Sequence, residues 1–167
     1  MTDSELDDFV IDTNVWVMVD KIKDVGKLSL TEIDCIDACQ KWLRHFSTSH
    51  ARLVVDGYLT RKILTEYRRN IKGRQAQDLL NQLERLPRER LVEIDIAFDA
   101  DGFAILPFHT ADPKDRKFIA VALAHAPMPP IVDATDTDWT KEKINLNAYG
   151  ITIIELCPEY ISAKLAG

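Results

Sequence analysis

The sequence predicts an α/β fold, a three-layer α/β/α sandwich around a mostly parallel central sheet. Three observations support this prediction. Short apolar runs alternate with longer segments of helical periodicity, several runs stop on an acidic residue or a glycine, and 46% of the 167 residues are hydrophobic while 29% are charged. Strands that are separated by helices pair in parallel and need helices on both faces of the sheet. We therefore expect one globular domain over residues 1–167.

Five short runs are predicted strands because they are apolar and bounded by turn residues. In chain order they cover residues 9–12, 52–57, 91–95, 131–132 and 151–156. Gly57 ends the second run, Pro129 and Pro130 precede the fourth, and Gly150 precedes the fifth. Ligands of open parallel sheets bind outside the carboxyl ends of the strands, so the residues that follow these runs are candidate site residues.

Five segments are predicted helices because their apolar residues recur every three or four positions. They cover residues 30–46, 59–72, 75–86, 113–126 and 140–148. A polar loop over residues 21–29, centred on Gly26, precedes the first helix, and the third stops before Pro87. In the fourth helix, Asp112 is the expected N-cap and Pro113 the first helical residue.

Composition excludes several classes of protein. No apolar run approaches the roughly 18 residues of a membrane span, and the acidic N-terminal segment, residues 1–8, lacks the features of a secretory signal. We therefore expect a soluble, cytoplasmic protein. Its three cysteines, Cys35, Cys39 and Cys157, form no zinc-binding pattern with histidine, and we expect them to be buried, reduced thiols.

Charge is unevenly distributed along the chain. The net charge is −6, but residues 57–90 carry 9 basic and 4 acidic side chains between two acidic flanks. Helical spacing divides the segment 59–72 into an apolar arc, predicted to be buried, and an adjacent basic arc. The apolar arc comprises Leu59, Ile63, Leu64, Tyr67 and Ile71, and the basic arc comprises Arg61, Lys62, Arg68, Arg69 and Lys72. The basic arc is either a polyanion-binding surface beside an acidic site or a solvated helix face.

Three acidic residues occupy positions at which a site is expected. Asp12 ends the first strand, Glu66 lies on the border between the apolar and basic arcs, and Asp115 shares a helix face with apolar residues. Each also has a local structural interpretation. Asp12 is a candidate turn or N-cap residue, Glu66 is spaced for an ion pair with Lys62, and Asp115 fits a capping box.

A further acidic group follows the fourth strand. Asp133, Asp136 and Asp138 lie within six residues, where they form either part of a site or a solvated loop with an N-cap. Considered together, acids from these distant segments would raise one another's pKa if they met, unless a cation neutralised them. Carboxylate oxygens suit Mg²⁺ or Mn²⁺ rather than zinc.

Four motifs carry a resemblance to a known family. IDTNVWV contains Asp12, LTRKILTEYRRN contains Glu66, DPKDRKFIAVALA contains Asp115, and DATDTDW contains Asp136 and Asp138. Their order and spacing, from about residue 9 to residue 156, resemble those of PIN-domain ribonucleases, which include VapC-type toxins. The resemblance implies that Asp12, Glu66, Asp115 and Asp136 are the catalytic acids, and that Asp12, Asp115, Asp136 and the auxiliary Asp138 bind metal.

The same resemblance implies supporting residues and partners. Thr13 or Asn14 would orient Asp12, and Asp133 stands where relatives often carry Asn or Thr, so it would either join the site or cap a helix. The implied activity is hydrolysis of single-stranded or structured RNA with Mg²⁺ or Mn²⁺. Basic residues would contact phosphates, namely Arg61, Lys62, Arg68, Arg69 and Arg116. An antitoxin protein and a homodimer are the implied partners.

Two other classes of function stay open from the sequence. In a non-catalytic PIN-like module, the acids would cap helices and the basic helix would bind protein or RNA. In a receiver-like phosphoacceptor domain, paired acids would hold Mg²⁺ beside a phosphorylated aspartate. No Ser/His/Asp arrangement, phosphate-binding glycine loop or dinucleotide fingerprint indicates another enzyme class.

Overall fold

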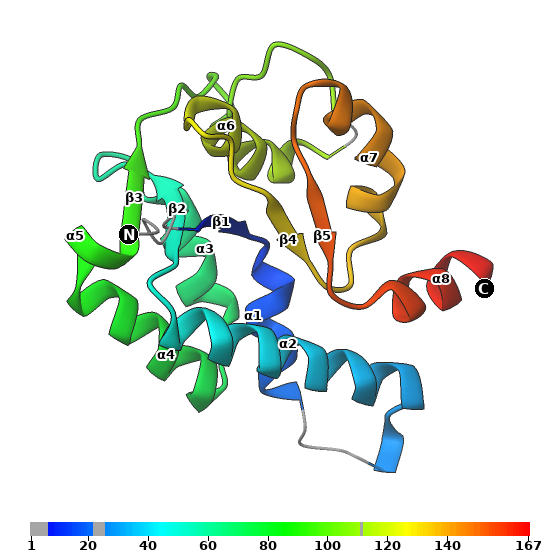
Figure 1. Ribbon diagram of the computed structural model, residues 1–167. Helices are drawn as coiled ribbons and strands as arrows, with labels where there is room; N and C mark the ends of the chain where they lie inside the picture. The colour runs from blue at the N-terminus through cyan, green and yellow to red at the C-terminus, as the bar shows by residue number, and fades with distance from the viewer. Residues whose placement is uncertain (1–6, 22–25, 111) are drawn as a thin grey trace, which may run out of the picture.

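The computed structural model describes residues 7–21, 26–110 and 112–167, and its centre is a five-stranded, entirely parallel sheet (Figure 1). The strand order is β3-β2-β1-β4-β5. The strands are β1 (Asp8–Ile11), β2 (Arg52–Asp56), β3 (Leu91–Ile94), β4 (Ile131–Asp133) and β5 (Ile153–Glu155). Most of the acidic N-terminal segment and part of the predicted loop 21–29 lie outside the described residues.

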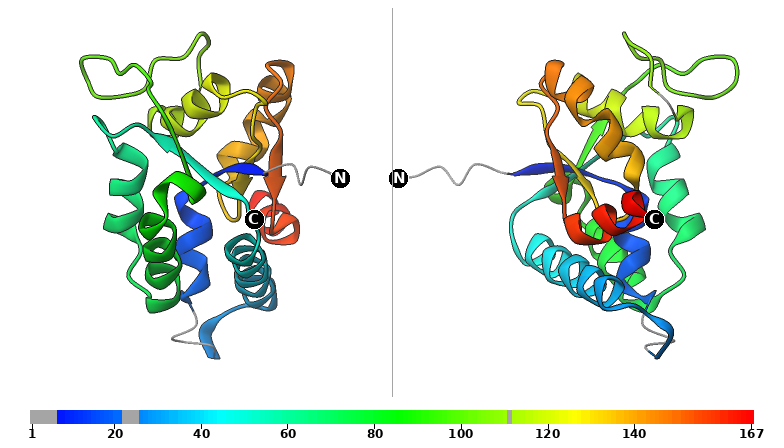
Figure 2. Two further views of the ribbon diagram at one scale, coloured as in Figure 1. Left: turned by 60° about the vertical axis from the view of Figure 1, so that its left-hand side comes forward. Right: turned by 90° about the vertical axis from the view of Figure 1, so that its right-hand side faces the viewer.

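Helices cover both faces of the sheet, which confirms the predicted three-layer α/β/α sandwich. Helices α6 and α7 pack on one side, and α1, α2 and α4 lie on the other (Figures 1 and 2). The helices are α1 (Thr13–Val19), α2 (Leu30–Thr48), α3 (Lys62–Asn70), α4 (Arg74–Arg85), α5 (Pro87–Arg90), α6 (Arg116–Ala124), α7 (Thr137–Ala148) and α8 (Pro158–Ala166). A short 3₁₀ helix, η2 (Pro113–Asp115), leads into α6.

The strand order decides one alternative. Receiver-like domains have the order 2-1-3-4-5, whereas here β1 lies between β2 and β4. The receiver-like hypothesis is therefore wrong. Because β1 is central, the carboxyl end of this strand lies beside those of β2 and β4, where the chain leaves the sheet at Asp56 and Asp133.

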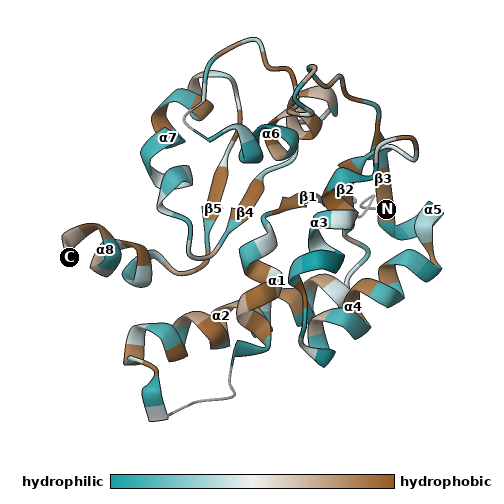
Figure 3. Ribbon diagram, turned by 180° about the vertical axis from the view of Figure 1, so that it is seen from behind, coloured by the Kyte–Doolittle hydropathy of each residue, from teal (hydrophilic) through white to brown (hydrophobic). Residues whose placement is uncertain are grey.

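The core is built from the apolar faces that the sheet and helices turn toward each other. Nearly all buried apolar side chains of the described residues form one cluster, in which Val10, Ile11, Val54 and Val132 are fully buried. In Figure 3 the strands are coloured as hydrophobic, whereas the helices alternate between hydrophobic and hydrophilic residues. The sheet thus forms a rigid support for the residues at its carboxyl edge.

Helix α3 begins later than the sequence predicted. The carboxylate of Asp56 accepts hydrogen bonds from the backbone nitrogens of Lys62 at 2.7 Å and Ile63 at 2.8 Å. Arg61 adopts a left-handed conformation with φ 45°. The two hydrogen bonds and the left-handed turn at Arg61 set the start of the helix at Lys62. Leu59 therefore lies outside the helix and is 89% exposed. Its assignment to the buried arc was wrong, whereas Ile63, Leu64, Tyr67 and Ile71 are buried as predicted.

Three helices were not predicted. The apolar residues after Asp12 form α1, which buries Trp16 in the core. Helix α5 follows Leu86 and begins with Pro87. Helix α8 follows Cys157 and begins with Pro158. All three have fewer than ten residues, which leaves too few turns for a clear apolar period. None of the described helices is both long and apolar enough to cross a membrane.

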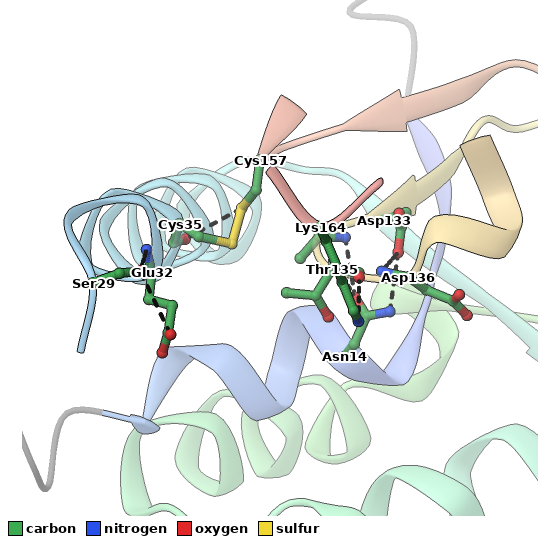
Figure 4. Close-up of a disulfide and its surroundings, with 10 residues drawn as sticks. Asn14, Ser29, Glu32, Cys35, Asp133, Thr135, Asp136, Cys157 and Lys164 are labelled. Carbon is green, nitrogen blue, oxygen red and sulfur yellow. Dashed lines mark hydrogen bonds between the residues drawn. A yellow bond between two sulfur atoms is a disulfide. The ribbon is translucent and has the colours of Figure 1, made fainter. Parts of the chain in front are cut away.

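The cysteines also differ from the prediction. Cys35 and Cys157 form a disulfide that joins α2 to the residue preceding α8 (Figure 4). Cys39 is a free, buried thiol. The prediction of three reduced thiols was therefore wrong, because the paired residues are 122 positions apart and only the packing of α8 against α2 brings them together.

Candidate metal centre and cleft

A cleft of about 920 Å³ opens at the carboxyl ends of the central strands. Helices α1 and α3, the segment from Phe98 to Ala104, η2, the β4–α7 loop and α8 all contribute to it. Three of the predicted catalytic acids line this cleft: Asp12, Glu66 and Asp136. The cationic side chains that line it are Lys62, Arg69, Lys114, Lys117 and Lys164.

Asp12 combines the two roles that the sequence left open. It is the N-cap of α1, and its Oδ1 accepts a hydrogen bond from the backbone nitrogen of Asn14 at 3.1 Å. Its Oδ2 accepts a hydrogen bond from the indole N–H of Trp139 on α7. Burial raises the pKa of Asp12 to about 6, although these two hydrogen bonds act in the opposite direction. The carboxylate is thus fixed in place and is costly to ionise.

Asp115 and Asp136 converge on Asp12 from two other segments. Each of the three residues offers a carboxylate oxygen, and these oxygens lie within 4.8 Å of one another. Burial raises the pKa of Asp115 to about 8, with further contributions from the charges of Asp12 and Asp136. Asp136 is the N-cap of α7, and burial raises its pKa as well. We call Asp12, Asp115 and Asp136 the carboxylate cluster.

Asp115 makes no capping hydrogen bond within the described residues, unlike the other two members of the cluster. The cap of η2 is Asp112, which accepts from the backbone nitrogen of Lys114 at 2.9 Å. The capping-box interpretation of Asp115 is therefore wrong. Close carboxylates with raised pKa values are the donor set that a divalent cation stabilises, and an all-oxygen set fits Mg²⁺ or Mn²⁺.

Asp138 lies beside the carboxylate cluster. Its carboxylate approaches those of Asp112 and Asp115 within the same 4.8 Å limit, so Asp115 belongs to both groups. Asp112 was predicted only as a helix cap, because nothing in its spacing distinguished it from an ordinary N-cap. The predicted metal residues are thus adjacent, with Asp138 on the Asp115 side of the cluster.

Glu66 lines the cleft but lies outside the carboxylate cluster. Its carboxylate accepts a hydrogen bond from the Thr13 hydroxyl and forms an ion pair with Lys117 at 2.8 Å. The expected alternative, a pair with Lys62, does not form, because the Lys62 ammonium donates to the carbonyl oxygen of Gly102. Thr13 therefore holds Glu66. Of the two residues that the resemblance offered for orienting Asp12, Thr13 or Asn14, it is Asn14 that donates to Asp12, through its backbone nitrogen.

Asn14 connects helix α1 to the end of β4 and to the loop that follows it. Its side-chain amide donates to Asp133 Oδ1 at 2.9 Å and accepts from the backbone nitrogen of Ala134 at 3.0 Å (Figure 4). Asp133 Oδ1 also accepts from the backbone nitrogen of Asp136 at 3.2 Å. Asp133 is fully buried, and burial raises its pKa to about 8. It thus fixes the β4–α7 loop and does not belong to the carboxylate cluster.

The structure brings only two of the predicted phosphate-binding residues to the cleft, Lys62 and Arg69. Arg68 points to α4, where it bonds to Asn81 at 2.7 Å and Glu84 at 2.8 Å. Arg61 and Arg116 do not line the cleft either. Helical spacing placed Arg68 and Arg69 in the same basic arc, but α4 packs beside α3 and its side chains bind Arg68.

Three lysines in the cleft were not predicted. Lys114 and Lys117 flank Asp115 in the motif DPKDRK, and their three-residue spacing is the sequence signal that would have indicated them. Lys164 belongs to α8, and its ammonium contacts the carbonyl oxygen of Thr135 at 3.5 Å (Figure 4). No sequence signal linked α8 to the cleft, because its position depends on packing against α2 and α7.

A scan against protein-family models gave no match for this chain, and searches of curated proteins and of solved structures gave none either. The resemblance to PIN-domain ribonucleases therefore stays an interpretation of the four motifs.

Proposed function

We propose that this chain is a nuclease that hydrolyses phosphodiester bonds of RNA with the help of a divalent metal ion. The observation that carries this proposal is the approach of the Asp12, Asp115 and Asp136 carboxylate oxygens to within 4.8 Å of one another. Asp12 and Asp136 line a cleft that also presents lysine and arginine side chains. An RNA phosphate drawn by these cations would meet the carboxylate cluster.

Each part of the site has a chemical role in this proposal. The carboxylate cluster would hold Mg²⁺ or Mn²⁺, with Asp138 beside it, and such an ion polarises a phosphate and lowers the pKa of an attacking water. Glu66 is held by Thr13 and Lys117 at the cleft, where its carboxylate can accept a proton from that water. Lys62 and Arg69 would hold the flanking phosphates without reading sequence.

A non-catalytic module explains the same residues less completely. Helix capping accounts for the positions of Asp12 and Asp136, but Asp115 makes no cap and has a pKa raised to about 8. Burying this carboxyl near two others opposes its ionisation at neutral pH, and a bound cation would remove that cost. Asp115 therefore favours a metal site over a purely structural group.

The test is cleavage of an unstructured RNA by the purified protein in Mn²⁺ and in EDTA. We expect cleavage in Mn²⁺ only, and a loss of at least about 100-fold in Asp12→Asn and Asp115→Asn. Asp37→Asn is the matched control, because Asp37 is exposed on α2 and pairs only with Lys41 within the described residues. Equal cleavage by all forms, or in EDTA, would contradict the proposal.

The resemblance also implies an antitoxin-like inhibitor, a homodimer and a cytoplasmic location, and these stay predictions. Size-exclusion chromatography with light scattering measures the oligomeric state directly. An inhibitor that occupies the cleft would protect the RNA from cleavage, and Lys117→Gln would weaken its binding because Lys117 lines that cleft.

A further inference from the structure

Part of the cleft lining is aromatic. The segment between β3 and η2 contributes Phe98, Gly102, Phe103 and Ala104 to the same cleft as Asp12 and Asp136. In Figure 1 the chain leaves the end of β3 and forms a long arch at the top of the view. We call residues 97–105 the aromatic arm. Both phenylalanines are only partly buried, so the cleft that Asp12 and Asp136 line also presents aromatic surface.

The aromatic arm is held as a short hairpin by its own hydrogen bonds. Phe98 and Ala104 form an antiparallel bridge, and the backbone nitrogen of Ile105 donates to the carbonyl oxygen of Ala97 at 3.0 Å. The Asp99 carboxylate accepts from the backbone nitrogen of Phe103 at 3.0 Å. The turn itself contains Gly102 at φ +83°, a conformation that favours glycine. Because the backbone is fixed, a ligand that contacts the rings does not have to order the arm first.

Lys62 connects the aromatic arm to helix α3. Its ammonium lies 4.5 Å from the centroid of the Phe98 ring and donates to the carbonyl oxygen of Gly102. Lys62 is the first residue of α3, which also carries Glu66 and Arg69 to the cleft. A positive charge is therefore fixed against the Phe98 ring, in the same cleft that Asp12 and Asp136 line.

We propose that Phe98 and Phe103 form a subsite that stacks an unpaired base of a single-stranded RNA next to the phosphate at the carboxylate cluster. This inference depends on the proposed function. Bases stack on aromatic side chains with little regard to sequence, and single-stranded binding sites combine such rings with cations that follow the backbone. A base inside a duplex is already stacked and paired, so the subsite selects unpaired RNA. The lysine and arginine side chains of the cleft attract a polyanion such as RNA and repel a basic protein segment.

The test measures RNA binding in EDTA, where the proposed cleavage is blocked. A short, unstructured RNA labelled with a fluorophore reports the Kd by anisotropy. We expect Phe103→Ala and Phe98→Ala each to raise the Kd by about 5- to 150-fold, and Phe103→Tyr to stay near the wild-type value. Ile105→Ala is the matched control, because Ile105 belongs to the arm, is 57% exposed and does not line the cleft. We expect Ile105→Ala to bind the unstructured RNA with the wild-type Kd. We also expect the Kd for a duplex RNA to be the same in the wild type and in the two alanine variants of the phenylalanines.

A spectroscopic readout separates stacking from a general effect on the fold. An RNA containing 2-aminopurine should lose fluorescence when bound by the wild type and by Phe103→Tyr, and should not when bound by Phe103→Ala at saturating protein. Unchanged Kd values in both alanine variants, or undiminished fluorescence in the wild-type complex, would overturn the subsite and leave the aromatic surface to a protein partner. Failure of the nuclease proposal is distinguishable, since cleavage in Mn²⁺ would then be absent while the ring-dependent binding persisted.

Discussion

Asn14 and Asp133 form a hydrogen bond of 2.9 Å although 119 residues separate them in the sequence. The bond joins the first turn of α1 to the end of β4, one residue before the loop that leads to α7. Asp12 and Asp136 flank this connection, and both belong to the carboxylate cluster. The relative position of two metal-binding candidates therefore depends on one neutral amide.

Replacing this amide tests the dependence. We expect Asn14→Ala to lower RNA cleavage by about 10- to 100-fold and to raise the Mn²⁺ concentration needed for half-maximal activity, because Asp133 loses its partner and the β4–α7 loop is released. Asn147→Ala, at an exposed position of α7, should cleave RNA as the wild type does. Wild-type Mn²⁺ dependence in Asn14→Ala would show that the amide does not position the cluster.

The raised pKa values predict how stability depends on pH in the metal-free protein. Asp115 and Asp133 have pKa values of about 8, against 3.8 for the unperturbed group, because burial opposes their ionisation. Between these values the folded state binds more protons than the unfolded state, so its stability must fall as the pH rises from about 4 to about 8. Asp12, with a pKa of about 6, contributes over the lower part of the range.

Thermal denaturation in EDTA measures this dependence. We expect the Tm to decrease over that interval, and the decrease to be smaller in Asp115→Asn, which cannot ionise. The Asp37→Asn control should follow the wild type. A Tm that rose steadily from pH 4 to pH 8 would show that these carboxyls are not buried as described.

Much of the fold and of the candidate site was predictable from the sequence. The five strands could be predicted because each is short, apolar and bounded by turn residues. Asp12 and Asp136 could be assigned to the site because they follow strands β1 and β4. Glu66 lies at the border of the buried arc of α3, as its helical angle indicated. These features depend on local pattern and on the general geometry of parallel sheets.

The features that were missed depend on tertiary packing. The Cys35–Cys157 disulfide and the place of Lys164 in the cleft both require α8 to pack against α2, and no periodicity reports that contact. Arg68 was assigned to the cleft because the helical wheel cannot show that Glu84 on α4 binds it. The aromatic arm has neither a helical nor a strand period, so Phe98 and Phe103 carried no signal.

Arg68 and Arg69 form a natural pair for testing the polyanion surface. They are adjacent in α3 and chemically identical, but only Arg69 lines the cleft. We expect Arg69→Gln to weaken the binding of single-stranded RNA and to reduce the salt dependence, d log K/d log[salt], by about 0.7. Arg68→Gln should leave both quantities unchanged and cost at most about 1 kcal/mol of stability through its lost pair with Glu84. Equal effects of the two variants would contradict the assigned cleft.

The disulfide predicts a redox-dependent stability. Reduction frees a loop closed over 122 residues and should lower the free energy of unfolding by about 2–4 kcal/mol. Urea denaturation with and without dithiothreitol measures the change. Cys157→Ala should be insensitive to the reductant, whereas Cys39→Ala should respond as the wild type does, because Cys39 is a free thiol. A wild type that reductant leaves unchanged would show that the bond does not stabilise the fold.

The most direct test of the carboxylate cluster is a crystal structure of the protein with Mn²⁺, with anomalous scattering measured to locate the ion. We predict an anomalous peak bonded to carboxylate oxygens of Asp12, Asp115 and Asp136, which disappears in crystals of Asp115→Asn grown in the same way. A Mn²⁺-saturated crystal with no peak at these three side chains would contradict the proposed metal site.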